Sequence, residues 1–139
     1  MKTILLVDDD DLIVEALSDL LSDQGYRVMS AENGAAGFSR MEKERPDLVI
    51  TDYMMPFVDG AELVLAMRAC PKCRSIPVLM ISSAPIAGAL ANTQEGAVLK
   101  ISAFLRKPFS ADELLDVVAQ LIGNGETEGA CADAECLAR

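Results

Sequence analysis

Short apolar runs alternate with longer amphipathic segments along the chain. Three runs are almost wholly apolar, as expected for strands that are buried on both faces: residues 3–7, 48–51 and 77–81. Two further runs, 26–31 and 103–106, interleave polar and apolar residues, which is typical of edge strands. The pattern therefore predicts five strands, three of them central in a sheet and two at its edges.

Segments with helical periodicity lie between these strands. The first places Ile13, Leu17 and Leu21 on one face of a helix. In the last, Ser110 and Glu113 have the spacing of a capping box and are followed by a long apolar face. The predicted helices cover 12–22, 34–44, 61–69, 86–99 and the segment from Ser110 to a terminating glycine at Gly123.

Five strands that alternate with five helices predict an α/β domain around a parallel sheet. With right-handed crossovers, three central strands and two edge strands fit the flavodoxin-like, doubly wound order 2-1-3-4-5. Residues 1–123 are thus expected to form one domain. Residues 124–139 are small and acidic without an apolar period, so we expect a flexible tail and no output domain.

The composition of the chain argues against two classes of binding partner, nucleic acids and membranes. The chain has 22 acidic and 12 basic residues and a net charge of −10, which argues against a nucleic-acid surface. No apolar stretch approaches the length of a membrane span, and the first residues lack the cleavage site of a signal peptide. We therefore expect a cytoplasmic protein that binds neither nucleic acid nor membrane.

Polar side chains gather where the predicted strands end. Asp8 and Asp9 follow the first strand, Asp52 the third, Ser82 the fourth and Lys107 the fifth. Because parallel strands end at the same edge of a sheet, these side chains are expected to share one rim.

Three carboxylates on one rim repel one another, at a cost of roughly 4 kcal/mol for a pair about 4 Å apart. A divalent cation such as Mg²⁺ removes that cost and keeps coordination positions for phosphoryl oxygens. A carboxylate can itself be a nucleophile that forms an aspartyl-phosphate. Each residue alone also has an ordinary structural explanation, and Asp10 and Asp11 fit the start and cap of the first helix.

In these features the chain resembles the receiver domain of two-component response regulators. The stretches that carry the resemblance are ILLVDDD (4–10), PDLVITDYMMPFVDG (46–60), PVLMISS (77–83) and FLRKPF (104–109). The resemblance implies a phosphoacceptor at Asp52 and a phosphoryl-binding hydroxyl and amine at Ser82 and Lys107. It also implies a Mg²⁺ (or Mn²⁺) site formed by Asp8, Asp9, Asp52 and the backbone carbonyl of Met54. Ser82 and the aromatic residue Phe104 would together form a conformational switch.

The resemblance further implies a signalling switch that catalyses only its own phosphotransfer and autodephosphorylation. The phosphoryl donor would be a histidine kinase or a histidine phosphotransfer protein, since the chain contains no histidine. A downstream protein target is implied but not identified. The segment APIAGALANTQEGAVLKISA (84–103) is unusually apolar for this family, so we hypothesise that the 86–109 face docks a partner or a second copy of the chain.

Two other functions remain open at this point. The chain could be a receiver-like adaptor that works without phosphorylation. It could also be a haloacid-dehalogenase-type phosphatase with Asp8 as nucleophile, although this would leave the 46–60 motif without a role.

Four cysteines complete the set of reactive side chains: Cys70 and Cys73 in a CPKC pair, and Cys131 and Cys136 in the tail. A CxxC pair is typical of zinc or disulfide sites, but these pairs lie far apart in sequence and no histidine accompanies them. We interpret them as free thiols.

Overall fold

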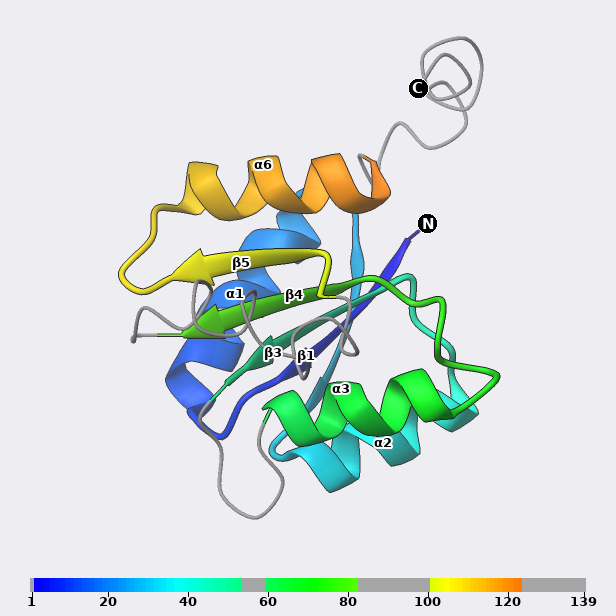
Figure 1. The fold of residues 1–139 in the computed structure, drawn as a ribbon. Helices are drawn as coiled ribbons and strands as arrows, with labels where there is room; N and C mark the ends of the chain where they lie inside the picture. Colours follow the sequence, from blue (N-terminus) through cyan, green and yellow to red (C-terminus); the bar gives the residue numbers. More distant parts are fainter. Residues whose placement is uncertain (1, 54–59, 83–100, 124–139) are drawn as a thin grey trace, which may run out of the picture.

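The structure is a computed structural model that describes residues 2–53, 60–82 and 101–123. It contains a five-stranded parallel sheet in the order β2-β1-β3-β4-β5 (Figure 1). The strands are β1 (Thr3–Val7), β2 (Arg27–Ala31), β3 (Leu48–Asp52), β4 (Val78–Ser82) and β5 (Ala103–Arg106). The α/β class, the parallel sheet and the strand order predicted from the sequence are confirmed.

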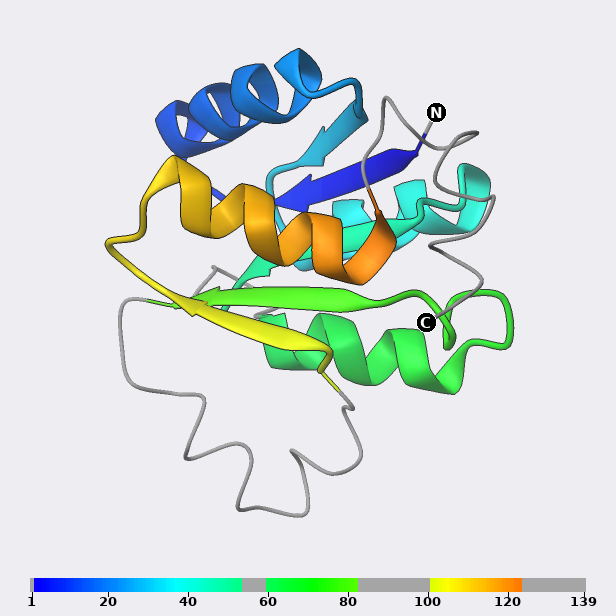
Figure 2. The ribbon, with the colours of Figure 1, turned by 90° about the horizontal axis from the view of Figure 1, so that it is seen from above.

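Helices cover both faces of the sheet (Figure 2). The described residues contain α1 (Asp11–Asp23), α2 (Gly34–Lys43), α3 (Gly60–Ala69) and α6 (Ala111–Ile122). Helices α1 and α6 lie on one face, and α2 and α3 lie on the other. The further helix expected over 86–99 and the tail expected over 124–139 lie outside the described residues. None of the described helices has the length and apolarity needed to span a bilayer.

Burial follows the pattern that distinguished central from edge strands. Every residue of β3 and β4 is buried, whereas β2 and β5 combine buried, partly buried and exposed positions. The sheet has one hydrophobic core on each face, and alternate residues of each central strand pack into opposite cores. In β1, Leu5 packs towards α2 and α3 and Ile4 packs towards α1 and α6. The sheet is therefore fixed from both sides, which holds the ends of its strands in place.

The ends of α1 and α6 carry specific caps. The Ser110 hydroxyl accepts a hydrogen bond from the Glu113 N–H (3.1 Å), and the Glu113 carboxylate accepts one from the Ser110 N–H (3.3 Å), so the predicted capping box is confirmed. At α1, a carboxylate oxygen of Asp10 accepts hydrogen bonds from the N–H groups of Leu12 (3.0 Å) and Ile13 (3.4 Å). Asp10 is thus the cap.

The assignment of Asp11 as the cap is wrong. A carboxylate oxygen of Asp8 accepts a hydrogen bond from the Asp10 N–H at 3.0 Å, and Asp10 has the extended backbone of a cap residue. Asp11 is therefore already the first residue of the helix, where its charge can only interact with the helix dipole.

Asp10→Ala should lower the free energy of unfolding by about 1 kcal/mol, because two N–H groups of the first turn lose their acceptor. Asp11→Ala should lower it by less, about 0.5 kcal/mol, because only a screened dipole interaction is lost. Urea unfolding of both variants in metal-free buffer measures the difference. A larger loss for Asp11→Ala would contradict the assignment of the cap.

Candidate functional site

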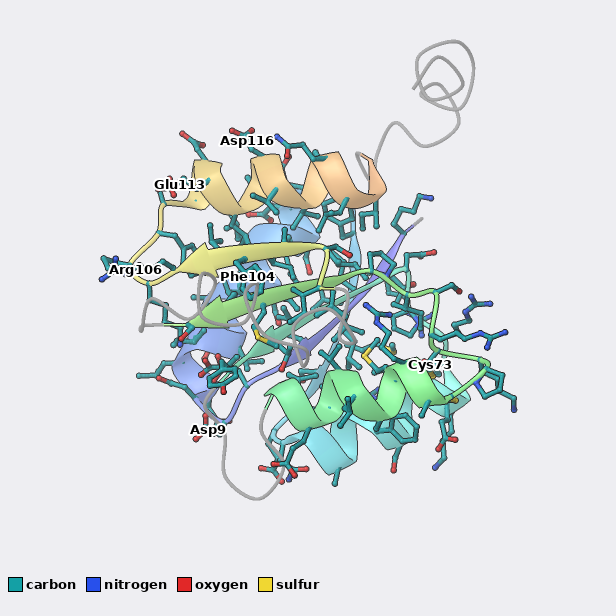
Figure 3. All side chains as sticks on the ribbon, viewed as in Figure 1. Asp9, Cys73, Phe104, Arg106, Glu113 and Asp116 are labelled. Carbon is teal, nitrogen blue, oxygen red and sulfur yellow. The ribbon has the colours of Figure 1, made fainter. Side chains whose placement is uncertain are left out.

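Three carboxylates from two neighbouring strands meet at the carboxyl edge of the sheet. Asp8 directly follows β1, Asp52 is the last residue of β3, and these strands are paired side by side. With Asp9 they form a group in which one carboxylate oxygen of each residue lies within 4.8 Å of the others. Figure 3 shows Asp9 at the end of the domain towards which the strand arrows point. The convergence expected from the sequence is therefore present.

The three carboxylates differ in their exposure to water. Asp8 and Asp52 are only 6% and 9% exposed, whereas Asp9 is an exposed residue. The cluster thus has two buried carboxylates, those of Asp8 and Asp52, and one that is exposed to solvent, that of Asp9. An ion held here would keep coordination positions open to water or to a phosphoryl group.

Lys107 supplies a positive charge at the same edge. Its Nζ lies 3.4 Å from a carboxylate oxygen of Asp52 and 4.0 Å from one of Asp8. The Lys107 N–H donates to the carbonyl of Ser82 at 2.8 Å, which holds the chain after β5 beside the end of β4. One ammonium group cannot neutralise three carboxylates, so the site keeps an excess of negative charge.

The excess negative charge is reflected in the pKa of Asp8. The pKa of this carboxyl group is raised from an ordinary value of 3.8 to about 6, chiefly by burial and also by the charges of Asp52 and Asp9. The N–H of Asp10 and the ammonium group of Lys107 act in the opposite direction. These donors suit a hard divalent cation, because such an ion binds carboxylate oxygens and relieves their repulsion.

Ser82 lies on β4, which pairs with the acceptor strand β3, and Phe104 lies on β5, on the far side of β4. Ser82, the last residue of β4, is 3% exposed. Phe104 on β5 is partly buried, is in register with Met80 of β4 and packs against the core on the α2 and α3 side (Figure 3). Met54, the remaining member of the expected site, lies outside the described residues.

Gly60 and Thr51 both lie against the backbone of Asp52, a support that the sequence pattern did not indicate. A Cβ atom at Gly60 would lie 2.5 Å from the Asp52 carbonyl oxygen, and the Gly60 N–H donates to the carbonyl of Tyr53 at 2.9 Å. The buried Thr51 hydroxyl donates to the Asp52 carbonyl at 3.0 Å. Its only sequence signal is a hydroxyl residue within an otherwise apolar strand.

Comparison with known proteins agrees with this geometry. The response regulator receiver domain family matches residues 4–119. The probable transcriptional regulator ycf29 of Porphyra purpurea is 33% identical over 119 residues, which cover 86% of this chain. This alignment covers only 56% of the regulator, so the chain spans about half the length of such curated relatives.

Solved structures with the same fold include the chemotaxis protein CheY4 of Vibrio cholerae. It is 31% identical with a TM-score of 0.80, and the match covers 87% of this chain and 98% of CheY4. The receiver domain of the sensor histidine kinase PA1611 from Pseudomonas aeruginosa is 26% identical with a TM-score of 0.77, over 88% of this chain and 98% of that domain. Its structure has a magnesium ion coordinated in the active-site cleft.

Asp8→Asn should stabilise the metal-free protein at about pH 7.5 by on the order of 1–3 kcal/mol, because it removes a buried charge from the cluster. The raised pKa of Asp8 means that the folded state binds a proton more tightly than the unfolded state does. The stability of the unmodified protein should therefore increase as the pH falls from about 7 to about 5, and the advantage of Asp8→Asn should shrink over that interval.

Thermal unfolding across this pH range measures both effects. Asp9→Asn serves as the matched control, since its exposed carboxylate is hydrated and should change stability less. An Asp8→Asn variant that is no more stable than the parent at any pH would contradict the account of the cluster.

Proposed function

The chain belongs to the response regulator receiver family, and from this premise we propose that it accepts a phosphoryl group on Asp52 from a phosphohistidine. Receiver domains are signalling switches rather than classical enzymes. The observation that carries the proposal is the grouping of Asp8, Asp9 and Asp52, with the Lys107 ammonium group 3.4 Å from the acceptor. These residues combine a nucleophile, a candidate metal site and a positive charge.

The proposed reaction is a single transfer. A carboxylate oxygen of Asp52 attacks the phosphorus atom, an O–P bond forms, and the N–P bond to the donor histidine breaks. The chain contains no histidine, so the donor lies outside this sequence, in a histidine kinase or a histidine phosphotransfer protein.

Asp8, Asp9, Asp52 and the carbonyl of Met54 would hold a Mg²⁺ or Mn²⁺ ion. The bound ion supplies positive charge that offsets the repulsion between the carboxylates and the incoming phosphoryl group. Support comes from the oxygen donors of the cluster and from the magnesium ion in the PA1611 receiver domain. Lys107 binds a phosphoryl oxygen, since its ammonium group already lies beside the acceptor.

Phosphorylation would bias a conformational equilibrium through Ser82 and Phe104. The Ser82 hydroxyl would bind the phosphoryl group, and movement of the Ser82 backbone would be transmitted to the paired strand β5, which carries Phe104. Its partial burial supports a role for Phe104 as the residue whose position changes. We infer that the 86–109 face, described here only for 101–109, then binds the downstream target or a second copy of the chain.

We further propose that residues 1–123 act as the receiver unit. The extent of the match to CheY4 supports this proposal, because the chain covers 98% of that single chemotaxis protein.

Incubation with acetyl phosphate and Mg²⁺ should add the mass of one phosphoryl group to the protein, and borohydride trapping should place it on Asp52. Asp52→Asn should remove the adduct. Lys107→Ala should slow its formation by on the order of 10- to 100-fold, because a charge that stabilises the transferring group is lost. Asp116→Asn, an exposed position on α6, is the matched control and should react like the parent.

Each alternative predicts a different outcome. An adduct on Asp8 would contradict the proposal and support a phosphatase. If Asp52→Asn and the parent bound partners equally well in the presence of Mg²⁺ and phosphodonor, the domain would be an adaptor that works without phosphorylation.

A further inference from the structure

The CPKC segment lies at the end of the domain opposite to the acidic cluster. Cys70 directly follows α3, and Cys73 lies in the turn that leads to β4. Figure 3 shows Cys73 beside the last turn of α3, far from Asp9. The proposed phosphoryl transfer therefore gives this pair no role, and its chemistry can be considered separately.

A tight turn brings the two cysteines together. The Cys73 N–H donates to the carbonyl of Cys70 at 3.0 Å, and the Arg74 N–H donates to the same carbonyl at 2.9 Å. The bond between residues i and i+3 is that of a reverse turn, in which the two Cα atoms are less than about 7 Å apart. Disulfides need a Cα separation of about 4.4–6.8 Å. The backbone thus already meets the main requirement for a bond between the two sulfur atoms.

The two side chains are in contact as well. The Cys73 thiol forms a hydrogen bond with the Cys70 side chain. Cys73 belongs to the core on the α2 and α3 side, Cys70 is partly buried and packs against that core, and both are free thiols. The turn and the shared core thus keep the two side chains near each other.

Arg68 holds the turn in this position. Its guanidinium group donates to the carbonyl of Arg74 at 2.8 Å and to the carbonyl of Ile76 at 3.0 Å. Both acceptors follow Cys73 in the chain, so α3 and the turn are joined on either side of the pair. This contact limits the separation of the two thiols.

The two thiols differ in their access to solvent. Cys73 is 0% exposed, and burial, together with the hydrogen bond to Cys70, raises the pKa of its thiol to about 11. It is therefore protonated near neutral pH and shielded from reagents. Cys70 is partly exposed, so an oxidant meets Cys70 first.

Within the described residues, a zinc site is less compatible with these contacts. A structural zinc ion takes four ligands, usually from cysteine and histidine. In the parts of the chain that the structure describes, the only group of three or more candidate ligands is that of Asp8, Asp9 and Asp52. Two thiols in mutual contact, without further ligands, instead favour a two-electron oxidation.

We propose that Cys70 and Cys73 form a redox-active dithiol that a hydroperoxide converts into an intramolecular disulfide. The Cys70 sulfur attacks one peroxide oxygen, the O–O bond breaks, and a sulfenic acid and one molecule of water (or alcohol) form. The Cys73 sulfur then attacks the Cys70 sulfur, and the hydroxyl group leaves as water with the Cys73 proton. In total, two thiols lose two electrons and two protons, and one peroxide is reduced.

The test uses the full chain with Cys131→Ser and Cys136→Ser, so that only the proposed pair can react. After treatment with hydrogen peroxide, the intact mass should fall by two hydrogen atoms, and both thiols should resist alkylation until a reductant is added. Trypsin cuts after Arg68, Lys72 and Arg74, so fragment 69–72 should remain joined to fragment 73–74 until reduction.

Single variants distinguish the roles of the two cysteines. Cys73→Ala should leave a Cys70 sulfenic acid that a 1,3-diketone traps, with no disulfide. Cys70→Ser should greatly reduce the reaction with peroxide, because the remaining thiol is buried. Cys70→Ser changes a partly exposed residue, so it tests the proposal even if Cys73→Ala fails to fold.

Several results would overturn the proposal. One is a disulfide that joins two chains instead of Cys70 and Cys73 of one chain. A second is that, after peroxide treatment, fragments 69–72 and 73–74 separate without reductant. A third is oxidation of Cys70 beyond sulfenic acid while Cys73 remains a free thiol. Zinc bound in native mass spectra of the unmodified chain, with both thiols protected until a chelator is added, would also overturn it. None of these outcomes depends on phosphorylation of Asp52, so this proposal and the proposed function can fail independently.

Discussion

The repulsion between carboxylates that the sheet holds together is the constraint on which the rest of the site depends. Asp8 and Asp52 are both nearly buried, and only Lys107 and the Asp10 N–H offset the charge of Asp8. Burial and the neighbouring carboxylates raise the pKa of Asp8 to about 6, so the metal-free site is electrostatically unfavourable near neutral pH. Any group that brings positive charge to such a site lowers its free energy and so stabilises it.

The strand order explains how such a site can persist. Because β1 and β3 are neighbours at the centre of the sheet, and each is packed from both sides, the two carboxylates cannot move apart without disturbing both cores. The close contact of Gly60 with the Asp52 carbonyl adds to this restraint. The stability of the fold thus offsets the electrostatic repulsion within the acidic cluster. A divalent cation would remove that repulsion, and the energy released would strengthen its binding.

The sequence predicted the parts of the fold and site that depend on periodicity and strand order. Three apolar runs identified the central strands, and the ends of the predicted strands identified Asp8, Asp9, Asp52 and, after the edge strand 103–106, Lys107. Local geometry was harder to predict. Asp10 and Asp11 are equally good cap residues by type, and the hydrogen bonds that the Asp10 carboxylate accepts from the N–H groups of Leu12 and Ile13 select the first. Likewise, the contact between Gly60 and Asp52 joins two elements, and spacing alone does not reveal it.

Calorimetric titration with Mg²⁺ at about pH 6 and about pH 8, in buffers of different ionisation enthalpy, tests the central claim most directly. If the cation relieves the repulsion in the cluster, binding should release about half a proton near pH 6 and almost none near pH 8, and affinity should be higher at the higher pH. Asp9→Asn and Asp52→Asn should weaken binding strongly. Equal affinity at both pH values without proton release, or unchanged binding by Asp9→Asn, would contradict the account.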